Sequence, residues 1–287
     1  MPMPNRRARA GTLHVRDDAG AGQPVVFLHG LGGTSRYWAC RLACAPLEAR
    51  LVLVDLLGFG DSPRPWCRYT IDRHIQAIHE TIKDLDAALL VGHSMGAALA
   101  LIYAARYPDK VKGLVLISLP YFHDEASAYR WFRRTPSGWL MTNMVAAALA
   151  CVMTRRVAGL FLPWLLRRYP REVAQDLVKH NFLSSTTSLW EVLYRHDLRQ
   201  EALRLSPDLP VTCVHAVDDD TAPFAMVEAL AAEFPNWQLC ALARSGHHPW
   251  LWMTETCAGQ IQAALARAVT PAADGPSPPA LAARLKG

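Results

Sequence analysis

The stretch at residues 88–100, ALLVGHSMGAALA, decides the fold of this chain. It is an apolar run that stops at Gly92, presents one serine, and restarts as small residues that favour a helix. It therefore predicts a strand, a sharp turn and a helix. Glycines on both sides of such a turn remove side chains that would collide there, and the turn lifts the hydroxyl of Ser94 clear of the sheet. Ser94 is the candidate nucleophile.

Strands and helices are predicted to alternate along most of the chain. Short apolar runs predict strands at residues 12–16, 24–28, 51–54, 111–118, 210–216 and 237–241. Helical spacing of apolar residues predicts a helix before the central stretch, at Ile71, Ile75, Ile78, Ile82 and Leu85. The predicted fold class is α/β, a mostly parallel central sheet with helices on both faces. In such sheets the chemistry gathers at the carboxyl ends of the strands.

The alternation is interrupted once. Residues 121–209 have helical periodicity and many aromatic side chains but no convincing strand, so they predict a helical cap inserted into the core. The α/β core then comprises residues 12–120 and 210–269, which close with a helix at about 250–268. Residues 1–11 and 270–287 are expected to be flexible tails, and the second is rich in Pro, Ala and Gly.

Five motifs stand in an order and at spacings that resemble the α/β-hydrolase family over roughly residues 25–269. They are HGLGG at 29–33, DLLGFGDS at 55–62, GHSMG at 92–96, AVDDDTAP at 216–223 and SGHHP at 245–249. The resemblance implies the α/β-hydrolase fold with an inserted helical cap. It also implies a catalytic triad that follows the chain in the order serine, acid, histidine.

A base and an acid must assist the serine, because a hydroxyl is a poor nucleophile at neutral pH. The resemblance places the base at His247, which directly follows a glycine in the loop after the last strand. His248 is the alternative. Such a base abstracts the proton of Ser94 and later returns it to the leaving group.

The acid of the triad is expected within the run of three aspartates at 218–220. In similar sequences the acid stands four residues before a proline, and the step from Asp219 to Pro223 matches. Asp218 is the runner-up. Ala216 stands where the family commonly has a glycine, which leaves the register of this loop open.

Two backbone N–H groups are candidates for the oxyanion hole. The N–H of Met95 lies at the start of the predicted helix, and the resemblance indicates the N–H of Leu31, in the glycine-rich loop, as the second donor. His29 and His93 lie where the family does not place its base, so they are expected to shape the pocket or the fold.

Serine at the turn favours chemistry at an acyl carbon. Epoxide hydrolases and haloalkane dehalogenases of this fold use aspartate there, because they attack an alkyl carbon. The sequence thus predicts a serine hydrolase that cleaves a carboxylic ester or lactone of a largely apolar, small-molecule acyl substrate. A thioesterase or acyltransferase acting on a carrier-bound or coenzyme A-bound acyl group is the alternative, and a non-catalytic ligand-binding member is a minor one.

The net charge of +5 is concentrated in the middle of the chain, where residues 122–206 hold 12 Lys and Arg against 7 Asp and Glu. Basic residues do not alternate with aromatic ones in a run, so nucleic-acid binding is not predicted. Two apolar segments, 144–153 and 157–166, are followed by Arg155-Arg156 and Arg167-Arg168. Both are too short to span a bilayer. They predict either the lining of an acyl pocket or a surface that touches a membrane or an acidic acyl carrier.

The compartment and cofactors are predicted from the ends of the chain and its cysteines. Residues 1–11 hold three arginines and no apolar run, so they do not resemble a secretory signal and a cytoplasmic protein is expected. Seven scattered cysteines, without a C-x-x-C pair, predict neither a disulfide framework nor a zinc site. No metal or organic cofactor is implied.

Overall fold

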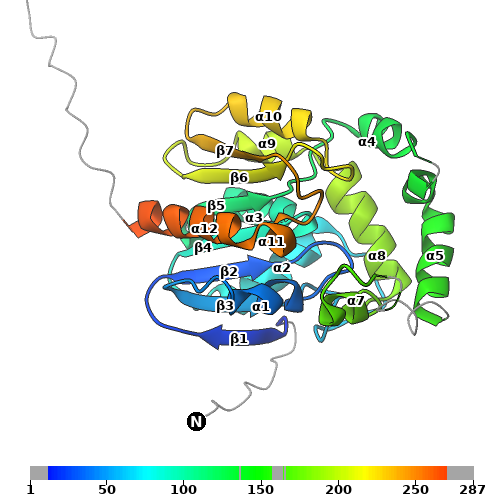
Figure 1. Ribbon diagram of the computed structural model, residues 1–287, viewed down its shortest axis with the longest axis horizontal. Helices are drawn as coiled ribbons and strands as arrows, with labels where there is room; N and C mark the ends of the chain where they lie inside the picture. Colours follow the sequence, from blue (N-terminus) through cyan, green and yellow to red (C-terminus); the bar gives the residue numbers. More distant parts are fainter. Residues whose placement is uncertain (1–11, 136, 157–163, 165, 270–287) are drawn as a thin grey trace, which may run out of the picture.

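A seven-stranded sheet forms the centre of the computed structural model, which describes residues 12–135, 137–156, 164 and 166–269 (Figure 1). The strand order is β1-β3-β2-β4-β5-β6-β7. The strands are β1 (Val15–Ala19), β2 (Pro24–Leu28), β3 (Arg50–Val54), β4 (Ala88–His93), β5 (Val111–Ile117), β6 (Val211–Ala216) and β7 (Trp237–Leu242). Strands β2 to β7 pair in parallel and β1 pairs antiparallel with β3, so the sheet is mostly parallel.

Helices cover both faces of this sheet. The core helices are α1 (Arg36–Leu42), α2 (Ile71–Ile82), α3 (Met95–Arg106), α10 (Phe224–Ala232), α11 (Pro249–Trp252) and α12 (Thr254–Val269), with a 3-10 turn at Pro108–Lys110. Side chains alternate along a strand, so Val25 and Phe27 belong to the buried cluster that includes residues of α1, α11 and α12, whereas Val26 and Leu28 belong to the cluster that includes residues of α2 and α3. Figure 1 shows α1, α11 and α12 in front of the sheet and α2 and α3 behind it.

The cap follows β5 and ends before β6. Its elements are α4 (Glu125–Phe132), a 3-10 helix at Ser137–Thr142, α5 (Met144–Arg156), α7 (Arg171–Asp176), α8 (Phe182–Ser188), a π-helical turn at Leu189–Tyr194 and α9 (Leu198–Ala202). The described residues of 121–209 form no strand, and one isolated bridge joins His180 to Phe59. Figure 1 shows α4, α5, α7 and α8 beyond the carboxyl ends of the parallel strands, while α9 lies beside the core.

Two predicted elements differ from the observed ones. The first strand begins at Val15 rather than Thr12, because the N–H groups of Leu13 and His14 donate to the side chains of Thr81 and Ser62 instead of a neighbouring strand. The predicted last helix is two helices.

The backbone of Met253 is not helical, and it separates α11 from α12. This bend allows Trp250 to bury its ring against Trp38 while Ile261 of α12 packs on the sheet. Residues 1–11, 270–287, 157–163 and 165 lie outside the described residues, so the predicted tails and most of the second apolar segment are not described.

Candidate active site

Ser94 occupies the turn between β4 and α3. Its backbone has φ +52° and ψ −120°, a conformation that side chains rarely adopt and that costs roughly 1–3 kcal/mol. A Cβ on Gly96 would lie 2.2 Å from the carbonyl oxygen of Leu28, and one on Gly92 would lie 2.4 Å from the oxygen of Gly96. Both positions therefore require glycine. This turn, residues 92–96, is called the elbow below.

The structure brings His247 and Asp219 to Ser94. His247 follows β7 and Asp219 follows β6, and both loops meet the elbow at the carboxyl edge of the sheet. The Oγ of Ser94 lies 2.9 Å from Nε2 of His247, and Nδ1 of His247 lies 2.9 Å from Oδ2 of Asp219. The carboxylate keeps the proton on Nδ1, so Nε2 is free to accept the serine proton.

Asp218 and Asp219 have different partners although they are adjacent. Asp219 is buried and its Oδ1 accepts the N–H groups of Thr221 and Ala222, both at 2.9 Å. Burial opposes its ionisation, but the hydrogen bond and charge interaction with His247, the N–H of Ala222 and the nearby His215 together outweigh burial and lower its pKa. It is therefore an anion at neutral pH, beside the imidazole that it orients.

Asp218 points to the backbone of the histidine loop instead. Its Oδ1 accepts the N–H groups of Ser245 at 3.0 Å and Gly246 at 2.9 Å, and these bonds lower its pKa. The carboxylate closes the loop that carries His247 without touching the imidazole of His247. Of the two candidates, Asp219 is the one that contacts the base.

His248 does not replace His247 in this arrangement. Its ring packs against the rings of Tyr37 and Tyr169, at 5.8 and 5.4 Å between centroids. Burial, together with the neighbouring His247, lowers the pKa of His248 to about 3. His248 is therefore a neutral ring that packs against its aromatic neighbours.

The glycine-rich loop lies against the elbow. A Cβ on Gly30 would be 3.1 Å from the Cβ of Ser94. The carbonyl of Gly30 accepts from Nδ1 of His29 at 2.8 Å and from the N–H of Gly33 at 3.1 Å. Because a trans peptide points its N–H opposite to its carbonyl, the Leu31 N–H faces away from the His29 ring.

Both predicted oxyanion donors are free to bind a ligand. Within the described ranges, no acceptor pairs with the N–H of Leu31 or of Met95. His29 holds the loop in this orientation, because its Nε2 accepts the N–H of Leu56 at 2.9 Å and so leaves the proton on Nδ1. Burial lowers the pKa of His29, which keeps this ring neutral.

His93 links the elbow to the histidine loop. Its Nε2–H donates to the carbonyl of His247 at 2.7 Å, and its ring stacks on Tyr37 at 4.5 Å. Burial and the nearby rings of His247 and His248 hold the pKa of His93 well below its usual value. The sequence predicted a structural role for His93. It could not predict this bond, which joins residues 154 positions apart, because no pattern near His93 indicates its partner.

The cap is tied to the glycine-rich loops by buried polar contacts. Asp176 of α7 accepts from Oγ1 of Thr34 at 2.6 Å and pairs with Lys179 at 3.0 Å. The carbonyl of Lys179 accepts the N–H of Gly60 at 2.9 Å. These contacts hold the cap over the loops that end β2 and β3.

One group among the described residues places three possible metal ligands within 4.8 Å of one another, namely His14, Asp55 and Asp61. Asp55 already accepts the N–H groups of Ser35 and Asp61 through its two oxygens. Asp55 therefore holds the backbone of two loops in place, and this role explains the group better than metal binding does.

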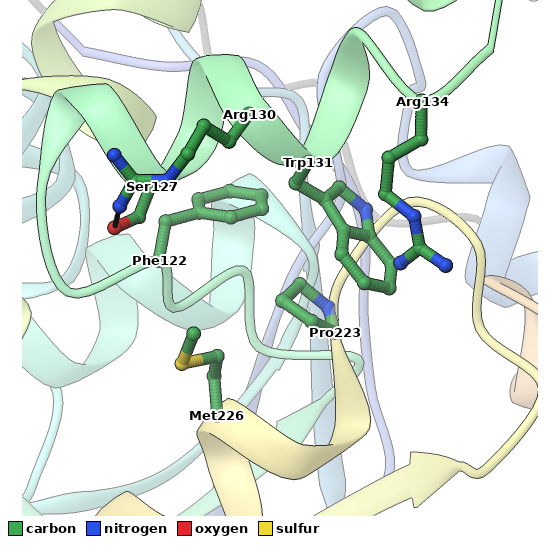
Figure 2. A pocket seen from close by; sticks show the side chains of 7 residues that line it. All are labelled: Phe122, Ser127, Arg130, Trp131, Arg134, Pro223 and Met226. Carbon is green, nitrogen blue, oxygen red and sulfur yellow. Dashed lines mark hydrogen bonds between the residues drawn. The ribbon is translucent and has the colours of Figure 1, made fainter.

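Two hollows open next to the acid and histidine loops. One, of about 610 Å³, is lined by His247, Arg168, Arg244 and Trp252 among others. The other, of about 200 Å³, lies between α4 and the start of α10 (Figure 2). There the indole N–H of Trp131 donates to the carbonyl of Asp220 at 2.9 Å, which connects the cap to the loop of the acid.

A family model described as the alpha/beta hydrolase fold matches residues 23–253. The chain therefore belongs to the alpha/beta hydrolase fold family, and the predicted fold is confirmed. The structure of a thermophilic esterase from Thermogutta terrifontis superposes with a TM-score of 0.70 at 22% identity, covering 88% of this chain and 93% of that one. At this identity the likeness concerns the fold alone.

The curated relatives agree on the family and differ in coverage. The AB hydrolase superfamily protein YisY of Bacillus subtilis is 29% identical over 248 residues, 82% of this chain and 88% of that protein. The Probable lysophospholipase BODYGUARD 4 of Arabidopsis thaliana is 38% identical over 104 residues. That match covers 34% of this chain and a quarter (25%) of the plant protein.

Proposed function

We propose that this protein is a serine hydrolase that cleaves a carboxylic ester or lactone with a largely apolar acyl group. The observation that carries the proposal is the continuous hydrogen-bonded row from Asp219 through His247 to Ser94. A serine in this row attacks acyl carbon, whereas attack on an alkyl carbon requires a carboxylate at the same position.

The proposed reaction uses each of these groups in turn. The Oγ of Ser94 adds to the ester carbonyl carbon as Nε2 of His247 takes its proton, and Asp219 stabilises the imidazolium. The N–H groups of Leu31 and Met95 donate to the oxyanion of the tetrahedral intermediate. When the C–O bond breaks, His247 gives the proton to the leaving alkoxide and an acyl-enzyme remains. Water then adds to the acyl carbon with the same base, which releases the acid and restores the serine hydroxyl.

The same steps would expel a thiol from a thioester, so the leaving group separates the two enzymatic candidates. Turnover of matched oxyesters and thioesters over a series of acyl chain lengths distinguishes them. The complete hydrogen-bonded row, with two unpaired N–H donors beside it, favours turnover over a role in ligand binding alone. A preference for longer acyl chains would support an apolar acyl site.

Covalent labelling tests the nucleophile directly. A fluorophosphonate should label Ser94 and an activated ester should give a burst of product. Ser94→Ala should abolish labelling and lower the rate of acyl transfer by about a millionfold. The matched control is Ser206→Ala, which removes a surface hydroxyl of the cap. Labelling of another residue, or retained turnover in Ser94→Ala, would refute the proposal.

A further inference from the structure

Exposed apolar side chains gather on the cap. Thirteen large hydrophobic side chains are exposed among the described residues, and seven of them lie between residues 139 and 164. They include Val145, Leu149 and Met153 of α5, and the tryptophans Trp139 and Trp164. Apolar surface concentrated in this way marks an interaction site.

The exposed residues of α5 form one stripe. Val145, Leu149 and Met153 are 70, 62 and 58% exposed and recur every four positions, so they share one face. The opposite face carries Ala147, which packs on the main core, and buried Cys151. Packing within the protein thus accounts for the inner face and leaves the outer face without a partner among the described residues. Figure 1 shows α5 at the far edge of the cap.

Positive charge flanks this stripe in the sequence. Residues 126–170 contain seven arginines and no Asp or Glu. Arg155 and Arg156 are exposed at the end of α5, and Arg156 lies one turn beyond Met153 on the same face. In the part of the chain that the structure describes, no ion pair involves any of these arginines.

Arginine and tryptophan also stack on one another elsewhere on the cap. The guanidinium of Arg167 lies 4.9 Å from the ring centre of Trp164, and that of Arg134 lies 4.5 Å from Trp131. Tryptophan rings and the long side chains of arginine are enriched where an apolar medium meets water, because each has an apolar body and a polar end.

The length of α5 excludes a transmembrane role for it. Thirteen residues extend about 20 Å, whereas the hydrocarbon core of a bilayer is about 30 Å thick. Among the described residues there is likewise no helix with the length and apolar character needed to cross a membrane. A short apolar face with arginines at its border is suited to lie flat in the interface.

We propose that this face docks on the surface of an anionic lipid bilayer, with α5 in the plane of the interface. We call it the cap face, defined by Val145, Leu149 and Met153 together with Arg155 and Arg156 at the end of α5. Acyl chains bury the aliphatic stripe while anionic headgroups pair with the arginines. An acidic carrier protein would satisfy the arginines but would leave the stripe against polar surface. The proposal is independent of the hydrolase proposal.

Vesicle flotation tests the docking separately from catalysis. The full chain carrying Ser94→Ala should bind vesicles of phosphatidylcholine with about a quarter phosphatidylserine, and added salt should weaken the binding. Vesicles of phosphatidylcholine alone should bind it at least about tenfold less well. Because this variant lacks the candidate nucleophile, failure of the hydrolase proposal does not alter the binding result.

Two sets of variants separate the apolar and the charged contributions. Val145→Ser, Leu149→Ser and Met153→Ser combined should weaken binding to the anionic vesicles by roughly tenfold or more. Arg155→Gln with Arg156→Gln should do so by about tenfold, and should flatten the salt dependence. The controls, Leu203→Ser for the first set and Arg73→Gln with Lys112→Gln for the second, change exposed residues outside the cap face and should bind as the parent does.

The arginine variants keep the test decisive if the serine variants fail to fold, because they change only exposed charges. Absence of binding to anionic vesicles at low salt would overturn the proposal. Equal binding to neutral vesicles, or binding that the arginine variants leave unchanged, would do the same. Binding of an acidic acyl carrier protein without any binding of vesicles would assign the cap face to a protein partner and refute the proposal of bilayer docking.

Discussion

Helices α3 and α5 are both rich in apolar residues, yet they use them in opposite ways. Every residue of α3 from Met95 to Ala104 is buried between the sheet and its neighbouring helices. In α5, only Cys151 is buried and the large residues of one face point outward. The apolar residues of α3 are explained by contacts inside the protein. Those of α5 require a partner outside the described residues, which is the basis of the bilayer proposal.

Polar groups show the same contrast. Around the elbow, Asp219, Asp218, His29 and His93 each have a defined hydrogen-bond partner, so contacts within the protein hold the candidate site in place. On the cap face, Arg155 and Arg156 form no ion pair with any residue that the structure describes. The polar groups around the elbow are paired within the protein, whereas the cap face exposes arginines and apolar side chains to solvent.

The largest effect is expected from the carboxylate that orients the base. Asp219→Asn removes the anion that keeps the proton on Nδ1 of His247, and should lower kcat for an activated ester by about 10⁴-fold. Steady-state kinetics measure this. The control is Asp218→Asn. Its amide oxygen can still accept the N–H groups of Ser245 and Gly246, so kcat should fall only a few-fold. A larger loss of kcat in Asp218→Asn than in Asp219→Asn would assign the acid to Asp218.

Next in size is the packing of the elbow. Gly96→Ala places a Cβ 2.2 Å from a backbone oxygen of β2, and should cost about 3 kcal/mol or more in the free energy of unfolding. Gly259→Ala on α12, where no atom lies within 4 Å of the new Cβ, should instead stabilise the protein by roughly 1 kcal/mol. Urea unfolding measures both. Equal changes in the free energy of unfolding for the two variants would show that the elbow is no more closely packed than the exposed position on α12.

Acid should destabilise the protein through its buried histidines. Burial lowers the pKa of His74 to about 3, whereas the unfolded chain binds this proton near pH 6.5. The unfolded state therefore holds more protons between these values, and stability is lost as pH falls through this window. At pH 5, His74 alone should cost about 2 kcal/mol relative to pH 7.5.

Urea unfolding of His74→Gln against pH measures this contribution, because the variant should lose stability less steeply between pH 6.5 and 5. His123→Asn, at an exposed position of the cap, is the matched control and should follow the parent. A parent protein equally stable at pH 7.5 and pH 5 would contradict the buried, neutral state of His74.

The smallest effect is expected on the outer face of α5. Leu149→Ala should change the free energy of unfolding by no more than about 0.5 kcal/mol, because the side chain makes few contacts. The same change at fully buried Leu99 of α3, a positive control for the assay, should cost about 2–5 kcal/mol. A large loss at Leu149 would mean that this face has a partner within the chain and would break the contrast with α3.

The strands and the elbow could be predicted because their signals are local. Apolar runs, glycines and helical spacing act over a few residues, and they located β2 to the residue and the start of β4. The start of β1 could not be located in this way, because it depends on Thr81 and Ser62, which capture the N–H groups of Leu13 and His14. A pattern of side chains does not reveal which distant group will take a backbone hydrogen bond.

By itself, the sequence determined the fold family and the turn that carries the candidate nucleophile, since the glycines that such a turn requires must stand beside the serine. The step to Pro223 favoured Asp219 over Asp218, and only the tertiary structure shows that Asp219 is the aspartate that contacts His247. A shift of one residue in that loop would redirect the carboxylate, and the N–H groups of Ser245 and Gly246 hold Asp218 away. The orientation of α5 was likewise decided in three dimensions, because an apolar helix exposes whichever face its neighbours leave uncovered.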